Sequence, residues 1–284
     1  MKIQIAACVL VLATALAPEA LAHNTKDCAP FEWGRIAYGT FENDQAFITV
    51  PVAVSALKTS MPFQLDTGSG ATYLYDPALD ENEKGRTLAT EIAIDAPGWT
   101  ASARDIKLKH GAAESKSRGT LGVDLLGSGV VLDLKAGTLC PLTPARAAGF
   151  ADWQVMERSG TSPVIRVNDG HRDLRLLLDT GSSAFSVLST RGRSKALKRG
   201  ESVRKFDVPS FNSSLSVTEL KPEGQFTAFG KALDTPFVYA FNHPLAGFAL
   251  NRGKIDGLIG LTPFAGGALA FDFEGNRIAY READ

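Results

Sequence analysis

Short apolar runs separated by polar turns recur along the chain, a pattern typical of a protein built mainly from β-strands. Residues 47–54 (FITVPVAV) form one such run, and a short polar link leads to a second at residues 62–65. Residues 163–167 and 174–178 form a similar pair, joined by an Asn-Asp-Gly link that favours a hairpin. Long amphipathic helical patterns are scarce, so we predict a mostly β fold containing an internal repeat.

The second run of each pair ends in the same residues. Residues 63–69 read FQLDTGS and residues 176–182 read LLLDTGS. Asp-Thr-Gly alone is a common turn sequence, but here the apolar lead-in and the following Ser are repeated as well. An apolar strand ending at a Gly-containing turn would therefore deliver Asp66 and Asp179 to equivalent places.

Two facing carboxylates have a distinctive chemistry. They cannot both ionise cheaply at short distance, so they share a proton and can act together as an acid and a base. The repeated motif therefore predicts one site made from two equivalent halves.

A second repeated element follows each aspartate motif. Residues 119–126 read GTLGVDLL and residues 257–264 read GLIGLTPF, which places Gly122 and Gly260 at equivalent positions. Each element is followed by a predicted apolar strand carrying an Asp, at residues 130–139 and 268–278.

The predicted boundary between the repeats lies in residues 141–160, which carry a modest helical pattern around residues 145–156. We therefore expect domains at residues 23–150 and 151–284. Short helices are expected at residues 77–84 and 190–198.

The N-terminal segment predicts export. Lys2 precedes an apolar stretch that is too short to span a bilayer comfortably, and Ala20-Leu21-Ala22 is a typical cleavage site. We expect a signal peptide over residues 1–22, cleaved after Ala22, and a periplasmic or secreted protein. No later segment reaches membrane-spanning length, and the net charge of −1 over 284 residues gives no indication of nucleic-acid or anionic-membrane binding.

Cysteine and histidine positions limit the remaining chemistry. Cys28 and Cys140 remain after cleavage, and an even pair in an oxidising compartment favours a disulfide, with two separate buried thiols as the alternative. The four histidines lack metal-ligand spacing, and no serine-nucleophile or phosphate-binding motif is present. We expect neither a metal nor a cofactor.

The doubled Asp-Thr-Gly-Ser motif, followed each time by an apolar-Gly element, resembles the aspartic peptidases. Two such halves in one chain resemble the bilobed pepsin-like arrangement, although each half is more similar to the compact retropepsin-like domains of bacteria. The resemblance covers nearly all of residues 23–284. It implies two tandem, pseudo-symmetric β-barrel lobes with a cleft between them.

The resemblance also implies roles for individual residues. Asp66 and Asp179 would be the catalytic pair, and the hydroxyl groups of Thr67 and Thr180 would brace the two loops across the site. Gly122 and Gly260 would belong to loops packed behind the aspartate strands.

The glycine and serine of each motif also have roles that follow from their size and chemistry. Gly68 and Gly181 lack a Cβ atom, so the two loops can approach closely. Ser69 and Ser182 can each donate a hydrogen bond to the nearby carboxylate and favour its charged form.

Such enzymes are similar in having a hairpin flap over the cleft. The candidate is residues 88–108, with residues 95–99 as the turn. Pepsin-like enzymes usually carry a Tyr on the flap; this segment has none, and Trp99 is the candidate substrate-binding residue in its place.

We therefore expect a monomeric, exported aspartic-type endopeptidase that hydrolyses extended polypeptide with a water activated between the aspartates. A catalytically silent, two-lobed peptide-binding protein is the alternative, against which retention of both aspartates argues. A third reading is an enzyme acting on a non-peptide amide or ester.

Overall fold

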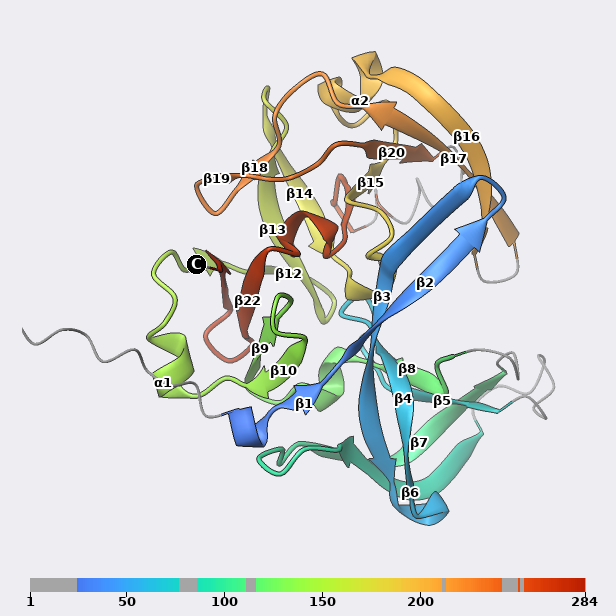
Figure 1. Ribbon diagram of the computed structural model, residues 1–284, viewed down its shortest axis with the longest axis vertical. Helices are drawn as coiled ribbons and strands as arrows, with labels where there is room; N and C mark the ends of the chain where they lie inside the picture. The colour runs from blue at the N-terminus through green and yellow to red at the C-terminus, as the bar shows by residue number, and fades with distance from the viewer. Residues whose placement is uncertain are drawn as a thin grey trace, which may run out of the picture.

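The computed structural model describes residues 25–76, 86–110, 116–210, 213–241, 250 and 253–283 (Figure 1). The expected signal peptide and the expected helix at residues 77–84 lie outside these residues. The described chain is mostly β-strand and forms three sheets, which confirms the predicted class of fold. In this part of the chain, no helix is long and apolar enough to cross a membrane.

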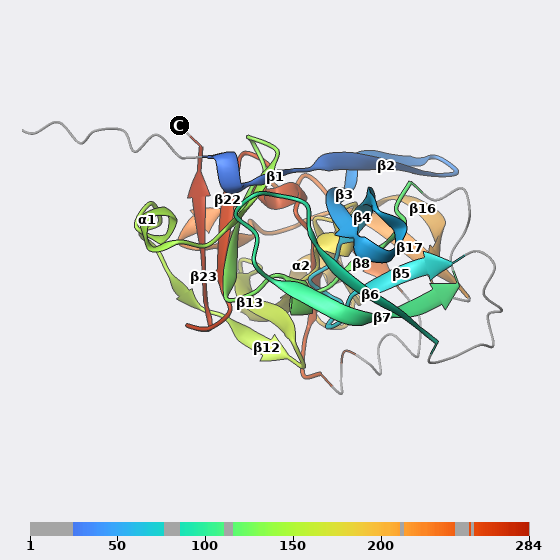
Figure 2. The same cartoon turned by 90° about the horizontal axis from the view of Figure 1, so that it is seen from below.

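The first sheet comes from the N-terminal part of the chain. Its strands are β2 (Glu32–Tyr38), β3 (Phe41–Val54), β4 (Thr59–Leu65), β5 (Tyr73–Asp76), β6 (Thr87–Ile94), β7 (Ser102–His110) and β8 (Gly119–Leu121). They lie in the order β2-β3-β4-β8-β5-β7-β6. Because β3 also pairs with β6, with Val52 opposite Ile94, the sheet returns on itself in a ring-like arrangement (Figure 2). Alternate residues of β3 are buried, as the period of a half-buried strand requires.

The second sheet comes from the C-terminal part. Its strands are β12 (Glu157–Ser159), β13 (Ser162–Asn168), β14 (Asp173–Leu178), β15 (Val187–Ser189), β16 (Glu201–Ser210), β17 (Ser213–Lys221), β18 (Thr227–Ala228), β19 (Lys231–Ala232), β20 (Val238–Phe241) and β21 (Gly257–Ile259). Nine of them follow the order β16-β17-β20-β15-β21-β14-β13-β18-β19, and β12 pairs with β13. The predicted hairpin is confirmed, since β13 and β14 pair with Asn168 opposite Asp173.

The third sheet joins the two parts of the chain. Its strands are β1 (Ala29–Pro30), β9 (Gly129–Asp133), β10 (Thr138–Pro141), β11 (Gln154–Val155), β22 (Gly267–Asp272) and β23 (Arg277–Glu282). They lie in the order β1-β10-β9-β22-β23-β11. The central pair, β9 and β22, is antiparallel with Leu132 opposite Leu269. Three strands from before residue 151 therefore pair with three from after it.

The predictions of one continuous strand at residues 130–139 and another at residues 268–278 are wrong. Each segment is a hairpin, β9–β10 or β22–β23. The two hairpins share an aspartate at the start of the turn. Asp133 Oδ1 accepts a hydrogen bond from Ala136 N at 2.8 Å, and Asp272 Oδ1 accepts one from Gly275 N at 2.7 Å. A short side chain that binds the backbone two or three residues ahead favours a turn over a continued strand.

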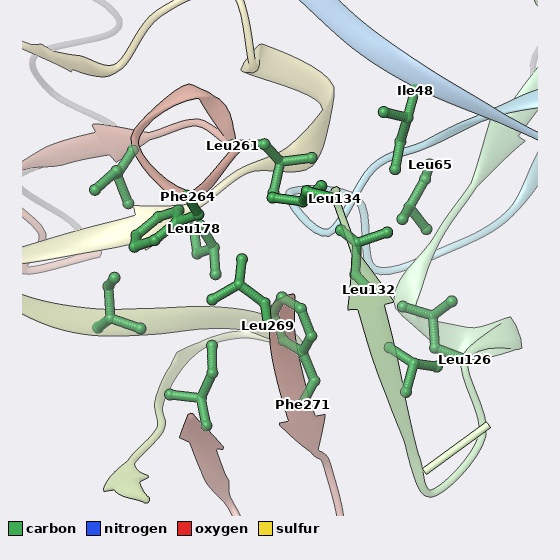
Figure 3. Packing of buried hydrophobic residues seen from close by; sticks show 14 of the residues in the cluster. Ile48, Leu65, Leu126, Leu132, Leu134, Leu178, Leu261, Phe264, Leu269 and Phe271 are labelled. Carbon is green, nitrogen blue, oxygen red and sulfur yellow. The ribbon is translucent and has the colours of Figure 1, made fainter. Parts of the chain in front are cut away.

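Buried side chains from the three sheets meet in one hydrophobic cluster (Figure 3). Leu65 and Leu178, which end the two aspartate strands, belong to it together with Leu132 and Leu269 of the third sheet. The strands that carry the aspartates are therefore held by the same core.

The β2–β3 hairpin extends from the first sheet to the second (Figure 1). Near its tip, the ring of Phe41 stacks on that of Phe206, with centroids 4.3 Å apart, and on that of Phe185. Arg204 donates a hydrogen bond to the backbone oxygen of Thr40. This hairpin therefore supplies apolar contacts to the C-terminal part of the molecule.

Helices are short. The α-helices with described bounds are α1 (Pro144–Ala147) and α2 (Lys195–Arg199), and the single-turn 3-10 helices are η1 (Thr25–Asp27), η2 (Ser55–Leu57), η3 (Val123–Leu125), η4 (Thr180–Ser182) and η5 (Thr262–Phe264). The helix expected around residues 145–156 is only one turn long, because the chain continues into β11, which pairs with β23. The helix expected at residues 190–198 is present only in its last turn, as α2.

The predicted disulfide between Cys28 and Cys140 is confirmed, with Cα atoms 4.2 Å apart. It lies beside the pairing of β1 with β10, in which Ala29 is opposite Leu139. The N-terminal segment is thus held covalently to the third sheet.

Candidate active site

Asp66 and Asp179 lie at the ends of equivalent strands. Asp66 follows β4, which runs parallel to β8, and its backbone N–H donates to Leu121 O at 3.0 Å. Asp179 follows β14, which runs parallel to β21, and its backbone N–H donates to Ile259 O at 2.9 Å. The same local structure therefore delivers both carboxylates.

The two aspartate loops approach each other closely at Gly68 and Gly181. A Cβ atom placed on Gly68 would lie 2.9 Å from Asp179 Cγ, and one placed on Gly181 would lie 2.8 Å from Asp66 Cγ. Each carboxylate thus lies against the glycine of the opposite loop, in space that a side chain would fill. The structure brings Asp66 and Asp179 to one place.

Thr67 and Thr180 connect the loops by four reciprocal hydrogen bonds. Thr67 Oγ1 donates to Leu178 O at 2.6 Å and accepts from Thr180 N at 3.2 Å. Thr180 Oγ1 donates to Leu65 O at 2.8 Å and accepts from Thr67 N at 3.0 Å. Both hydroxyl groups are buried, so each replaces water for two backbone groups of the opposite loop.

Two further side chains join the loops from outside this brace. Gln64 Nε2 donates to Gly181 O at 3.2 Å, and Ser162 Oγ donates to Gly68 O at 3.0 Å. Each glycine loop is therefore fixed by a residue from the other part of the chain. The sequence analysis missed Gln64 and Ser162, because only the three-dimensional fold places them against the glycines.

The serines of the motif behave differently from one another. Ser182 Oγ donates to Asp179 Oδ2 at 2.9 Å, as predicted. Ser69 Oγ instead donates to Ala71 O at 2.7 Å, and only the backbone N–H of Ser69 reaches Asp66 Oδ1, at 3.1 Å. The prediction that the Ser69 hydroxyl binds its carboxylate is therefore wrong. Asp179 has a hydroxyl donor that Asp66 lacks.

The electrostatics of the pair follow from burial and from this asymmetry. Burial, the charge of Asp179 and a hydrogen bond with its carboxylate raise the pKa of Asp66 to about 7. Burial also raises the pKa of Asp179, but hydrogen bonds from Ser182, Asp66 and the loop backbone oppose this rise. The pair therefore favours keeping one proton, and the hydroxyl of Ser182, which donates to Asp179 alone, favours the ionised form of Asp179.

Gly122 and Gly260 lie behind the loops, as expected. A Cβ atom on Gly122 would lie 2.5 Å from the backbone carbon of Ala71, and one on Gly260 would lie 2.7 Å from Ser183 Cα. Both contacts are with backbone, so a side chain at either position would displace the aspartate loop.

Asp124 is a supporting residue that the sequence analysis missed. Its carboxylate accepts hydrogen bonds from Thr72 N at 3.0 Å and Thr72 Oγ1 at 2.6 Å, and Thr72 Oγ1 accepts from Gly122 N. The equivalent position in the second half is Thr262, whose hydroxyl donates to Ser183 O at 2.5 Å. A polar residue two positions after each repeated glycine was the signal that could have identified this support.

Trp99 lies in the turn of the expected β6–β7 hairpin. That hairpin is present, with Ile92 opposite Ala103. Trp99 Nε1 donates to Leu125 O at 3.3 Å, the indole packs against the core, and Gly98 lies close to Asp27. These contacts hold the turn against η3 and the N-terminal segment and favour a structural role for Trp99 over contact with a substrate.

A metal centre has no support among the residues that the structure describes. No group of three or more His, Cys, Asp or Glu side chains in this part of the chain could hold a metal ion. The chemistry available at the site is proton transfer between two carboxyl groups of unequal acidity.

This site is defined by the geometry of its two halves and not by a known relative. Its two halves carry the same aspartate strand, threonine brace and glycine contacts. In comparisons with known proteins, no family model matches the chain and no curated protein is significantly similar to it.

Proposed function

We propose that this protein is an aspartic-type endopeptidase that hydrolyses peptide bonds of an extended polypeptide. The observation that carries the proposal is the apposition of Asp66 and Asp179, each against the glycine of the opposite loop and braced by Thr67 and Thr180. Two equivalent carboxyl groups with one shared proton are suited to acid–base hydrolysis.

The hydroxyl of Ser182, which donates to Asp179 and has no counterpart at Asp66, assigns the roles. A water between the carboxyl groups loses a proton to ionised Asp179 as its oxygen attacks the peptide carbonyl carbon. Protonated Asp66 donates a hydrogen bond to the carbonyl oxygen, keeps its proton, and stabilises the negative charge that develops on that oxygen. The proton held by Asp179 then passes to the leaving nitrogen as the carbon–nitrogen bond breaks.

We infer that the two parts of the chain are retropepsin-like lobes with a substrate cleft between them, over residues 23–150 and 151–284. The β-barrels expected from the sequence are not formed by the described strands, because the first sheet is only ring-like and the second runs from β16 to β19 without closing. The inference is supported by the equivalent parallel pairs β4–β8 and β14–β21, each next to one aspartate. It is also supported by the third sheet, to which each part contributes three strands.

The active unit in this proposal is a single exported chain. Each half supplies one aspartate, so activity per molecule should not fall on dilution as it does for half-site dimers. The disulfide supports folding in an oxidising compartment. Residues 1–22 would direct export to the periplasm or the medium and would be removed by cleavage after Ala22.

A digest of a diverse peptide pool tests the proposal. Protein comprising residues 23–284 is incubated with the pool from about pH 3 to 8, with and without a pepstatin-type inhibitor. We expect cleavage that the inhibitor blocks and that Asp179→Asn, a variant of the same shape, lowers by at least ~10³-fold. A folded wild-type protein that cleaves nothing at any pH would contradict the proposal and favour the silent peptide-binding protein. If the protein cleaves only non-peptide amides or esters, its substrates belong to that class and not to polypeptides.

A further inference from the structure

A row of paired residues crosses the first sheet beside the aspartate loops. Gln64 of β4 is opposite Thr120 of β8, which is opposite Tyr73 of β5, which is opposite Lys107 of β7. Directly paired residues project from the same face of a sheet. Since Gln64 Nε2 binds Gly181 O, this face lies toward the Asp179 loop.

Lys109 lies on that face. It is two residues beyond Lys107 on β7, so its side chain projects in the same direction. Its Nζ atom lies 3.5 Å from the centroid of the Tyr73 ring, which is a cation–π contact. Lys109 is exposed and Tyr73 is half-buried. A positive charge is therefore held over an aromatic ring on an open part of this face.

Lys109 is also close enough to the aspartates to interact with them electrostatically. Partial desolvation by the surrounding atoms lowers the pKa of Lys109, the charge of Asp66 opposes that change, and the charge of Lys107 adds to it. Within the described ranges, no carboxylate lies within ion-pair distance of this ammonium group. An ammonium group at this place attracts a carboxylate that binds beside the carboxyl pair.

The other side chains of this face are polar. Tyr75 and Thr120 share a hydrogen bond of 2.6 Å between their hydroxyl oxygens. An apolar side chain bound here would leave an ammonium group and polar oxygens without solvent, whereas a carboxylate would satisfy the ammonium.

We propose that Lys109 and Tyr73 form a subsite that selects an acidic substrate side chain next to the scissile bond. The subsite rests on the proposed peptidase function and adds a substrate class to it. An extended peptide places alternate side chains toward the same wall, so the preference falls on one position, at the end of the substrate that the first sheet binds. The substrate carboxylate must be ionised while Asp66 keeps its proton, so selection operates between about pH 5 and 7.

Matched peptides that differ only by Glu or Gln at each position flanking the cleaved bond test this subsite. At one position, the wild-type enzyme should show kcat/KM roughly 3- to 10-fold higher for Glu, the range of a partly exposed ion pair. Lys109→Ala should bring the Glu/Gln ratio close to one, and Lys109→Glu should reverse it. The wild-type ratio should also fall as salt is added.

Lys205→Glu is the matched control. It makes the same charge change at an exposed lysine of β16 in the second sheet, and it should leave the Glu/Gln ratio at its wild-type value. Because both peptides meet the same enzyme preparation, the ratio does not depend on the fraction that is folded.

The outcomes separate the two proposals. Cleavage with a Glu/Gln ratio that is near one at every position in the wild type, or that Lys109→Glu leaves unchanged, would overturn the subsite and leave the peptidase standing. Cleavage of neither peptide by folded wild-type protein would remove the peptidase function and the subsite with it.

Discussion

At the scale of single residues, the two carboxyl groups differ because their serines do. Ser182 Oγ donates to Asp179, whereas Ser69 Oγ donates to Ala71 O. Ser183 and Ala184 follow Ser182 and are held by hydrogen bonds with Thr180 O and Ala46 O. After Ser69, the backbone of Gly70 and Ala71 runs differently, so that Ala71 O accepts the hydrogen bond from the Ser69 hydroxyl. The motif itself is identical, so the sequence could not show this difference.

Ser182→Ala should change the pH dependence, and Ser69→Ala should not. Loss of the Ser182 hydroxyl removes a donor that lowers the pKa of Asp179, so the acid limb of kcat/KM should move to higher pH. The Ser69 hydroxyl does not touch its carboxylate, so its loss should leave the acid limb in place. Profiles of both variants against wild type provide the check, and an equal shift in both would contradict the assigned asymmetry.

Asp66→Asn should stabilise the fold, increasingly as the pH rises. The pKa of Asp66 is about 7 in the folded protein, above its ordinary value of about 3.9. The folded state therefore loses stability as the pH rises from about 4 to 7, because the unfolded chain releases this proton over that range while the folded chain keeps it on the buried group. Asparagine has no such proton to lose. Thermal denaturation of both proteins should show a Tm difference that grows over this range; a difference independent of pH would count against the raised pKa.

At the scale of elements, the aspartate loops are held as a braced pair. The resemblance of the repeated motif implied a threonine brace, and the hydrogen bonds between Thr67 and Thr180 confirm it. The third sheet could not be predicted from the sequence pattern, because it pairs segments far apart in the chain, with Leu132 opposite Leu269. The β3 strand begins at Phe41, earlier than its apolar run, because pairing with β2 and contacts to Phe206 extend it.

Thr180→Val should weaken the brace, whereas Thr180→Ser should preserve it. Valine keeps the shape but removes the hydroxyl that binds Leu65 O and Thr67 N, and leaving buried polar groups without partners costs about 1–3 kcal/mol each. Urea denaturation should therefore show a loss of ~2 kcal/mol or more in the free energy of unfolding for the valine variant. If the serine variant loses as much as the valine variant, packing of the methyl group is the cause instead of the brace.

At the scale of the whole molecule, the third sheet and the β2–β3 hairpin hold the two parts together, and the disulfide fixes the N-terminal segment to the third sheet. The disulfide was predicted correctly, because Cys28 and Cys140 are the two cysteines that follow the expected signal peptide, and an even pair favours a bond in an oxidising compartment. The interlocking of the parts was less accessible to prediction. It depends on side chains such as Phe41 and Arg204, whose partners lie far away in the sequence.

Removal of the disulfide should destabilise the whole molecule. The bond joins residues separated by 112 positions, and closing a loop of that length stabilises by up to ~4 kcal/mol in the chain-entropy model. Cys28→Ser combined with Cys140→Ser should therefore unfold at lower urea concentration than wild type. Reductant should lower the urea midpoint of the wild type and leave that of the double variant unchanged. A wild-type midpoint that stays the same after full reduction would contradict the expected stabilisation by the disulfide.

The most direct test of the shared proton is the pH dependence of kcat/KM, measured from about pH 3 to 9 for wild type, Asp66→Asn and Asp179→Asn, each confirmed to be folded. A pair that works with one proton gives a bell, because activity falls when Asp179 gains a proton and again when Asp66 loses its own. We expect an optimum on the acid side of neutral, an alkaline limb near pH 7 and a loss of at least ~10³-fold in either variant. Substantial peptidase activity in either asparagine variant, or a wild-type rate that does not decline above pH 7, would contradict the account.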